Sequence, residues 1–243
     1  MDMLQNLAEY YEELFPVSDT QKKFYEKILN QYSKPAHFLG IQCGTGGFEY
    51  HLAKLGLDVT GIDSEKDFIE RANRKRRTQL MSLRFFQMAP QEITKFLCKD
   101  FYNAISCINW RLILEQDRKN IENFFADAKT LLSKDGKLIL ELPNFDFYNG
   151  LSDFSFVEKS SIRSKLYSDL YVNDDDEVFL NQIVETGNSR FVKIFEDKKI
   201  YPIVQAEIRL FAKNAGFSQI QFYSDYDETP LSAESECFIC VIS

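Results

Sequence analysis

The sequence predicts an α/β protein built on a doubly wound, mostly parallel sheet that carries an inserted set of antiparallel strands. Three observations predict this fold. Apolar strand segments alternate with amphipathic helices over residues 36–143, the connections between them are short, and the alternation stops near residue 150. Strands separated by helices pair in parallel, and the right-handed crossovers then place helices on both faces of the sheet.

The elements follow from hydrophobic periodicity and from the residues that begin and end helices. Two amphipathic helices are expected at about 3–15 and 19–32, the second capped by Ser18 or Asp19. Further helices are expected after the turn 43–47, after Ser64, at APQEITKFL, at about 118–133 and at VQAEIRLFAKNAG. The expected strands are AHFLGIQ, LDVTGID, SLRFFQM, YNAISCI, KLILELP (after a KDG turn), FSQIQFY and ECFICVI.

The region of residues 150–201 has a different pattern. It holds KLYSDLYV, DEVFLNQIVET, RFVKIFE and KKIYPI, separated by NDDD, GNS and DKK, which predicts a meander of antiparallel strands. We therefore divide the chain into N-terminal helices (1–35), one α/β domain (36–149 and 202–243) and an insertion (150–201). The insertion is expected to be a substrate lid or an oligomer contact.

Composition limits the classes of partner. The chain has 243 residues and a formal net charge of −8, which disfavours nucleic acids and anionic membranes. No signal peptide and no apolar run long enough to span a membrane is visible. The five cysteines are odd in number and scattered, as expected of reduced thiols in the cytoplasm. Cys237 and Cys240 lie on opposite faces of a strand, so neither a metal site nor a redox pair is expected. Monomer and homodimer both stay open.

The functional signal is a glycine-rich turn followed by an acidic residue. Cys43-Gly44-Thr45-Gly46-Gly47 leaves the first strand and opens a helix, and Asp63 ends the second strand. A turn without side chains lets backbone N–H groups approach a ligand, and a carboxylate on the neighbouring strand tip can bind both hydroxyls of a ribose. The pattern predicts a nucleoside-type cofactor. The alternative is that the glycines only allow tight packing between strand and helix.

The residue types in the turn also limit which cofactor fits. A dinucleotide fingerprint needs glycine at the sixth position of G-x-G-x-x-G, where this chain has Glu49. A carboxylate there disfavours NAD or FAD, and with them an oxidoreductase. An adenosine cofactor without phosphate tolerates it, and S-adenosylmethionine (SAM) is such a cofactor.

The segment FLGIQCGTGGFEYHLAKLGLDVTGID resembles the first motif of class I SAM-dependent methyltransferases. LLSKDGKLILELPN resembles their fifth-strand segment, and IRLFAKNAGFSQIQFY resembles their penultimate helix and strand. The start, LAEYYEELFP, is similar to that of small-molecule members related to glycine and sarcosine N-methyltransferases, which also insert antiparallel strands after the fifth strand. The resemblance implies seven strands, the last antiparallel, and transfer of a methyl group to a small-molecule acceptor.

The resemblance also implies the site residues. The turn residues Cys43, Gly44, Thr45 and Gly46 are expected at the methionine part of SAM, Asp63 at the ribose and Ser64 at the adenine. The remaining implied residues are Gln42, Met88, Ala89, Cys107 and Ile108. Tyr11, Asn109 and Trp110 are the candidates for the acceptor pocket, roofed by Arg163, Tyr167 and Tyr171 of the insertion. Tyr11 is as readily explained by packing, and the insertion residues by surface positions.

Three departures from the family pattern stand out. Gly40 replaces the usual acidic residue of the first motif and Gln42 a usual glycine. Met88 or Ala89 replaces the acid that ends the third strand, and Asn103 a frequent aspartate. Loss of the first-motif carboxylate removes a counter-charge for the ammonium group of SAM. A lost hydrogen bond to a charged group costs about 1.5–3 kcal/mol of binding free energy. A catalytically inactive, ligand-binding relative is therefore the alternative function.

Other motifs favour structural roles. The basic run Arg74–Arg77 is expected to be solvated at a helix end, where cations are favoured, rather than to bind phosphate. His37 and His51 are expected to be structural. The run 174–177 lacks the spacing of a calcium loop and is expected to be an exposed turn. No metal is predicted.

Overall fold

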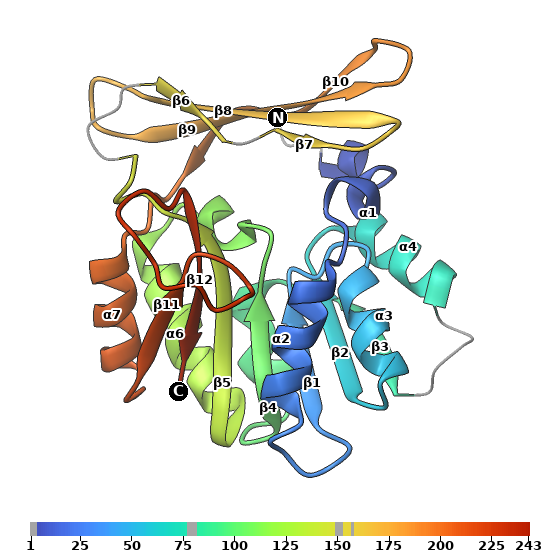
Figure 1. Ribbon diagram of the computed structural model, residues 1–243, viewed down its shortest axis with the longest axis vertical. Coiled ribbons are helices and arrows are strands. Elements are labelled where there is room, and N and C mark those ends of the chain that lie inside the picture. The colour runs from blue at the N-terminus through green and yellow to red at the C-terminus, as the bar shows by residue number, and fades with distance from the viewer. Residues whose placement is uncertain (1–3, 77–81, 149–152, 157) are drawn as a thin grey trace.

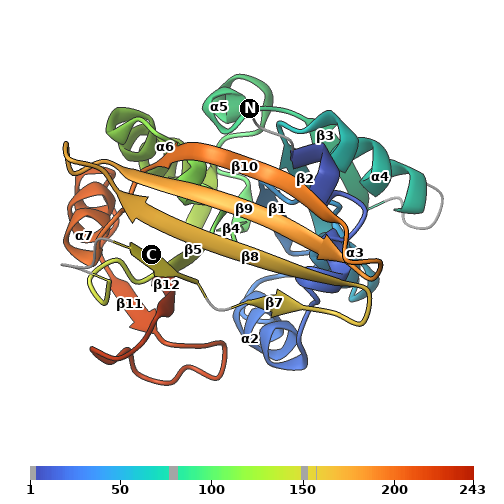
Figure 2. The same cartoon turned by 90° about the horizontal axis from the view of Figure 1, so that it is seen from above.

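Two β-sheets organise the chain, one lying across the top of the other (Figure 1). The structure is a computed structural model that describes residues 4–76, 82–148, 153–156 and 158–243. The larger sheet stands upright, and the smaller sheet covers the edge at which its parallel strands end, as the view from above shows (Figure 2). This edge is where ligands bind in doubly wound folds.

The larger sheet has seven strands in the order β11-β12-β5-β4-β1-β2-β3. Strand β12 runs antiparallel to both of its neighbours, and the other pairs are parallel. The prediction of a seven-stranded sheet with an antiparallel last strand is therefore confirmed. The strands are β1 (His37–Ile41), β2 (Asp58–Asp63), β3 (Leu83–Gln87), β4 (Tyr102–Cys107), β5 (Leu132–Pro143), β11 (Ile220–Tyr223) and β12 (Cys237–Ile242).

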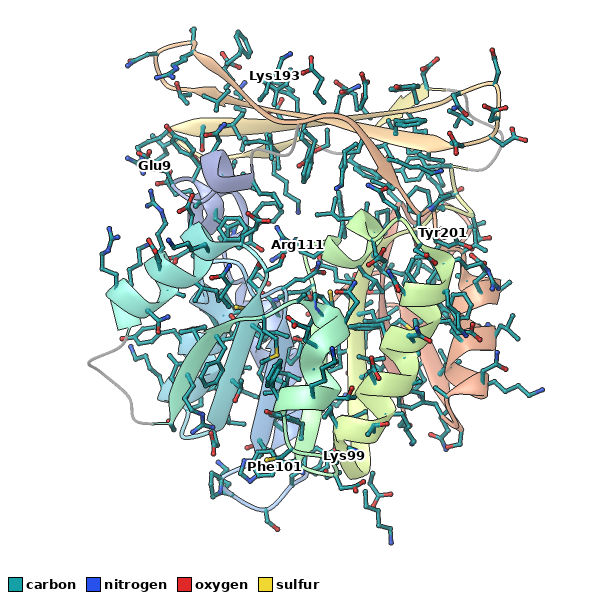
Figure 3. The ribbon with its side chains drawn as sticks, turned by 180° about the vertical axis from the view of Figure 1, so that it is seen from behind. Glu9, Lys99, Phe101, Arg111, Lys193 and Tyr201 are labelled. Carbon is teal, nitrogen blue, oxygen red and sulfur yellow. The ribbon has the colours of Figure 1, made fainter. Side chains whose placement is uncertain are left out.

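Helices cover both faces of this sheet (Figures 1 and 3). One face carries α2 (Asp19–Leu29) and α3 (Gly47–Lys54), which bury aromatic and aliphatic side chains such as Tyr25 and Leu52 against β1. The other face carries α5 (Ile93–Phe96), α6 (Arg118–Leu131) and α7 (Gln205–Asn214), while α4 (Lys66–Arg76) packs beside β3. Short 3₁₀ helices η2 (Pro90–Glu92) and η3 (Arg111–Leu114) follow β3 and β4. No helix in the described ranges is long and apolar enough to cross a membrane.

The smaller sheet is antiparallel, as predicted for the insertion. Its strands are β6 (Asp153–Ser155), β7 (Lys159–Ser160), β8 (Ser164–Val172), β9 (Val178–Thr186) and β10 (Phe191–Ile200). Burial alternates along β8, so that Leu166, Ser168 and Leu170 are buried while Lys165 and Asp169 are exposed. Leu170 and Leu180 belong to the same apolar cluster as Leu39 of β1. One hydrophobic core therefore joins the two sheets.

Two predicted turns are bulges instead. RFVKIFE and KKIYPI were expected as separate strands, but β10 continues through DKK, with register shifts against β9 around Phe195 and a positive φ at Asp197. The KDG segment likewise lies within β5, whose pairing with β4 skips from Leu132 to Lys137. In both places a residue in the left-handed region absorbs extra chain without ending the pairing.

The predicted N-terminal helix at 3–15 is wrong as a single element. The chain forms a 3₁₀ helix η1 (Leu4–Leu7), a turn and the short helix α1 (Tyr11–Leu14). Leu4, Leu7, Tyr11 and Leu14 are all buried, and the break between the two pieces lets each of them reach the core. The second helix begins as predicted, because the Ser18 hydroxyl accepts a hydrogen bond from the N–H of Gln21. Of the basic run at the end of α4, Arg77 lies outside the described residues.

Candidate functional site

The turn after β1 has an unusual backbone. Gln42, Gly44 and Gly46 have φ angles of 54°, 58° and 71°. This left-handed conformation suits glycine, and a glutamine that adopts it holds a strained position. Helix α3 begins at Gly47, directly after the turn. The glycine-rich turn is present where the sequence predicted it, but the left-handed conformation of Gln42 was not predicted.

Asp63 lies against this turn, as predicted. The N–H of Gly44 donates a hydrogen bond to Asp63 Oδ2 over 2.9 Å, and the N–H of Glu65 donates to Oδ1 over 2.9 Å. Strands β1 and β2 are parallel neighbours, so their ends share one edge of the sheet. The bare turn and the carboxylate therefore belong to one site.

A side chain covers the carboxylate, which the sequence did not reveal. Arg111, the first residue of η3, places Nη2 at 3.4 Å from both carboxylate oxygens of Asp63. The Asp63 side chain is 0% exposed and that of Arg111 is 6% exposed. Burial lowers the pKa of Arg111, but Asp63, Tyr11, Cys107 and Glu65 together offset this and hold it above its ordinary value. Both side chains of the pair are shielded from water.

Two glycines of the turn are also required by packing. A Cβ added at Gly44 would lie 2.4 Å from the ring of Tyr11, and one at Gly46 would lie 2.3 Å from the ring of Phe85. The glycines are therefore needed for close packing as well as for the left-handed backbone of the turn. Tyr11 closes the turn from the N-terminal side, and burial raises the pKa of its hydroxyl well above the ordinary value.

The missing first-motif carboxylate is supplied from another element. A Cβ added at Gly40 would lie 2.1 Å from Oε1 of Glu49, so the Glu49 side chain fills the space above Gly40. Glu49 is on α3 and is only 2% exposed. The Glu49 carboxylate therefore occupies the place that an acidic side chain at position 40 would have filled. The sequence signal was available: a lone acid stands on an otherwise apolar helix face.

Two cavities lie next to the turn that follows β1. A cavity of about 300 Å³, here called the β2-side cavity, is lined by residues that include Gln42, Ser64, Glu65, Ala89, Pro90 and Arg111. A second, of about 370 Å³, is called the α3-side cavity and is lined by residues that include Tyr11, Gln42, Cys43, Glu49, Ile108 and Asn109. Gln42 lines both. A ligand with a ribose at Asp63 could extend into each of them.

A third, smaller cavity lies between the two sheets. This inter-sheet cavity of about 40 Å³ is lined by residues that include Tyr11, Phe15, Asn109, Trp110, Arg111 and Lys159. All three predicted acceptor-pocket residues, Tyr11, Asn109 and Trp110, line it. Asn109 Nδ2 donates a hydrogen bond to the Tyr11 hydroxyl over 3.3 Å. Asn109 and Trp110 have φ angles of 57° and 58°, and Glu141 fixes this bend by accepting a hydrogen bond from the N–H of Asn109.

The predicted roof residues lie elsewhere. The insertion does cover the site, but Leu166, Ser168, Leu180 and Gln182 line the cavity. Tyr167 and Tyr171 are on the other face of β8, where their hydroxyls donate to Glu185 and Asp197. Arg163 pairs with Glu13 of α1. The prediction for these three residues is wrong. For Tyr167 and Tyr171 the reason is the register of β8, which decides the inward face and was not known from sequence. Arg163 precedes β8 and pairs with Glu13 instead.

Some of the other implied cofactor residues line the cavities, and others hold the turn and the strand ends in position. Thr45 donates its hydroxyl hydrogen bond to Glu12 over 2.9 Å, and Cys107 lies 3.3 Å from Gln42 Oε1. Burial raises the pKa of Cys107 to about 12, so its thiol stays neutral. The N–H of Met88 donates to the carbonyl of Asp63. These contacts hold the turn and the strand ends in place.

Asn103, one of the departures from the family pattern, and the residues that were predicted to be structural all have structural contacts. Asn103 accepts a hydrogen bond from the N–H of His37 and donates one to Ser133, which joins three strands at the far edge of the sheet. His51 lies 3.8 Å from Glu26. The acidic run 174–176 is an exposed turn between β8 and β9, held by the Asn173 side chain. Within the described ranges no three acidic, His or Cys side chains gather in a way that could hold a metal ion.

Comparison with known proteins places this geometry in a class. Residues 38–136, from β1 into β5, match the family described as a methyltransferase domain. Two solved structures share the fold over nearly the whole chain. They are the CcbJ methyltransferase of Streptomyces caelestis (TM-score 0.80, 15% identity, 97% of this chain and 95% of that one) and a SAM-dependent methyltransferase of Clostridium acetobutylicum (TM-score 0.76, 16% identity, 98% and 97%).

Two curated relatives refine the class. A glycine/sarcosine N-methyltransferase of Aphanothece halophytica is 24% identical over 253 residues, covering 99% of this chain and 89% of the relative. Another of that description, from Halorhodospira halochloris, is 26% identical over 214 residues, covering 84% and 73%. The resemblance to class I methyltransferases of the small-molecule type, enzymes that use SAM as methyl donor, is confirmed.

Proposed function

We propose that this chain is an active SAM-dependent methyltransferase whose acceptor is a small molecule. The observation that carries the proposal is the 2.9 Å hydrogen bond from the Gly44 N–H to Asp63, with Gln42 of the same turn lining two neighbouring cavities. A ribose at Asp63 would direct adenine into one cavity and a methionyl group into the other. The Cys43–Gly46 turn has no bulky side chain to block the line between them.

Each cavity suits one end of SAM. Ser64 and Ala89, with Met88 close by, would flank the adenine in the β2-side cavity. Cys43, Ile108 and the backbone of Gly44, Thr45 and Gly46 would border the methionyl group beside the α3-side cavity, with Cys107 behind Gln42. Gln42, which lines both cavities, would lie near the sulfonium. The lining of the α3-side cavity is mainly uncharged, and its carboxylates are those of Glu12 and Glu49.

Glu49 is the proposed partner of the ammonium group of SAM. Its carboxylate lines the α3-side cavity and fills the place of a Gly40 side chain. A charge-assisted hydrogen bond in a buried site contributes about 1.5–3 kcal/mol. The main argument for an inactive relative was the absence of an acid at position 40, and Glu49 removes that argument. It also continues to disfavour a pyrophosphate ligand.

The chemistry requires alignment more than acid–base catalysis. SAM would supply the methyl group from its sulfonium, and the sulfur would leave as a thioether when the acceptor attacks in line. Tyr11, Asn109 and Trp110 would orient the acceptor in the inter-sheet cavity, since they line it from the side of the turn. Leu166 and Leu180 of the smaller sheet would exclude water there. The names of the curated relatives point to an amine as the accepting group.

The net charge and the free thiols bear on the class of partner and on the cellular compartment. The net charge of −8 favours a free small molecule over a nucleic acid as partner. All five cysteines are free, which fits a reducing compartment such as the cytoplasm. The smaller sheet serves as a cover over the acceptor.

Calorimetry with S-adenosylhomocysteine tests the cofactor site directly. Wild-type protein is expected to bind it, Asp63→Asn to lose binding, and Glu49→Gln to bind at least about tenfold more weakly because an ionic contact is lost. Asp58→Asn, at the other end of β2, is the matched control and should bind like wild type. Absence of binding by the wild-type protein sinks the proposal. Methyl transfer from labelled SAM to glycine and sarcosine then tests the acceptor class.

A further inference from the structure

Arg111 stands between the proposed cofactor site and the proposed acceptor site. Figure 3 shows it where the larger sheet faces the smaller one. It lines the β2-side cavity and also the inter-sheet cavity. Its guanidinium carbon lies 5.3 Å from the centre of the Phe68 ring. A small rotation of this side chain would therefore move its charge from one site to the other.

The contacts that hold Arg111 in place are weak for a buried charge. Both distances to Asp63 are 3.4 Å, whereas charge-assisted N–H···O bonds are usually about 2.7–2.9 Å. Arg111 Nε is buried and has no hydrogen-bond partner among the described residues. Asp63 is satisfied independently by the N–H groups of Gly44 and Glu65. The guanidinium can thus leave without stripping the carboxylate of its other donors.

The segment before Arg111 is strained. Asn109 and Trp110 are consecutive non-glycine residues in the left-handed region, and such positions persist only where the surroundings impose them. The N–H of Tyr201, beyond β10, donates to the carbonyl of Ile113 in η3, which ties this segment to the smaller sheet. A rearrangement at Arg111 would therefore also move residues that line the inter-sheet cavity.

The inter-sheet cavity is prepared for a negative charge. Its lining contains Lys159 and Arg111 but no aspartate or glutamate among the described residues. Lys159 Nζ lies 4.8 Å from the ring centre of Trp110 and 5.1 Å from that of Phe15. Lys159 is held over aromatic rings with no carboxylate in the described part of the cavity lining, which favours an acceptor that carries an anionic group. Arg111 would add a second positive charge to this cavity once it leaves Asp63.

We propose that Arg111 is a cation shared by the two sites, which couples cofactor binding to acceptor binding. Without cofactor it covers Asp63. When the ribose hydroxyls of the adenosyl ligand donate to Asp63, the guanidinium is displaced into the inter-sheet cavity, where it binds the anionic group of the acceptor beside Lys159. The inference rests on the proposed function and adds an order to it: cofactor first, then an anionic acceptor.

Wild-type protein tests the coupling without any variant. Acetate, the probe for the anionic group, is compared with chloride at equal pH and ionic strength. Acetate should tighten S-adenosylhomocysteine binding at least about fivefold, because linked sites strengthen each other reciprocally. Trp110 is the only tryptophan, so its fluorescence should change when the ligand displaces the neighbouring arginine. Binding of S-adenosylhomocysteine that is unaffected by acetate overturns the proposal and leaves the proposed function intact.

Arg111→Met supplies the second test, with Arg84→Met as its control. Methionine keeps the packing on Phe68 but leaves Asp63 without its cation, so S-adenosylhomocysteine should bind about tenfold more tightly and acetate should no longer matter. Arg84 pairs with Asp58 away from the site, and its replacement should leave both quantities unchanged. Equal or weaker binding by Arg111→Met overturns the proposal. Should this variant fail to fold, Arg111→Gln, which keeps a hydrogen-bond donor for Asp63 but carries no charge, takes its place, and S-adenosylhomocysteine binding by it must then be unaffected by acetate.

Discussion

Strand β2 carries an Asp–Arg ion pair at each of its ends, and the two pairs differ in almost everything except residue type. At the start of the strand, Asp58 pairs with Arg84 of β3, and the side chains are 22% and 41% exposed. At its end, Asp63 and Arg111 are 0% and 6% exposed. Exposed charges are screened by water and salt, so the first pair contributes little to stability.

The buried pair needs more partners than the exposed pair does. Asp63 accepts hydrogen bonds from two backbone N–H groups in addition to Arg111. Taking two charges out of water costs several kcal/mol each, by order of magnitude, and only such extra contacts compensate. The exposed pair requires none of this. The comparison teaches that position on the strand, and not the identity of the pair, decides which carboxylate can become a binding group.

Loss of the buried partner should produce the largest effect. Asp63→Ala leaves Arg111 buried without a counter-charge, so we expect the free energy of unfolding to fall by about 3–5 kcal/mol. Asp58→Ala at the exposed end should cost less than about 1 kcal/mol. Urea denaturation of both variants gives the two values. Similar losses for the two would remove the distinction drawn between the ends of the strand.

A second buried carboxylate at the same edge sharpens the comparison. Gly40→Ala drives a methyl group against the Glu49 side chain, which is too buried to move freely, and should cost about 1–3 kcal/mol. In a Glu49→Ala background the same substitution should cost much less, because the space above Gly40 is then open. The coupling between the two changes is read from a double-mutant cycle. Additive losses would mean that Glu49 does not occupy this space.

The smallest effect is expected at the exposed pair. Arg84→Met should change stability by less than about 1 kcal/mol, and this difference should shrink as salt is added, since the Debye length falls to about 3 Å at 1 M. Thermal unfolding at low and high salt measures it. A difference that persists at high salt would show that Arg84 acts through packing instead of charge.

Much of the fold could be predicted because periodicity is a local property. The seven strands and the helices between them follow from apolar spacing, and Ser18 marks the start of α2 by its side chain alone. The misjudged elements are those in which distant contacts decide. Strand β10 runs through DKK because β9 continues to pair with it, and the N-terminal segment breaks so that Leu4 and Tyr11 can both be buried.

The candidate site divides in the same way. The turn and Asp63 were found because glycines and an acid at strand ends have a geometric meaning in a parallel sheet. Arg111 was not found, although an arginine in the apolar run RLIL is itself a signal that a buried charge needs a partner. Tyr167 and Tyr171 were wrongly expected over the acceptor because a shift of one position in a strand exchanges its two faces. Arg163 was wrongly expected there because its ion pair with the distant Glu13 could not be seen in the sequence.

The sequence by itself determined the order of elements, the glycine-rich turn at residues 43–47 and the acid at the end of the second strand, since each follows from residue types along the chain. Only the tertiary structure decided what surrounds them. It placed Glu49 above Gly40, Arg111 over Asp63 and Lys159 beside Trp110. These contacts join segments far apart in the chain, and whether a charge is buried or hydrated depends on everything that packs around it.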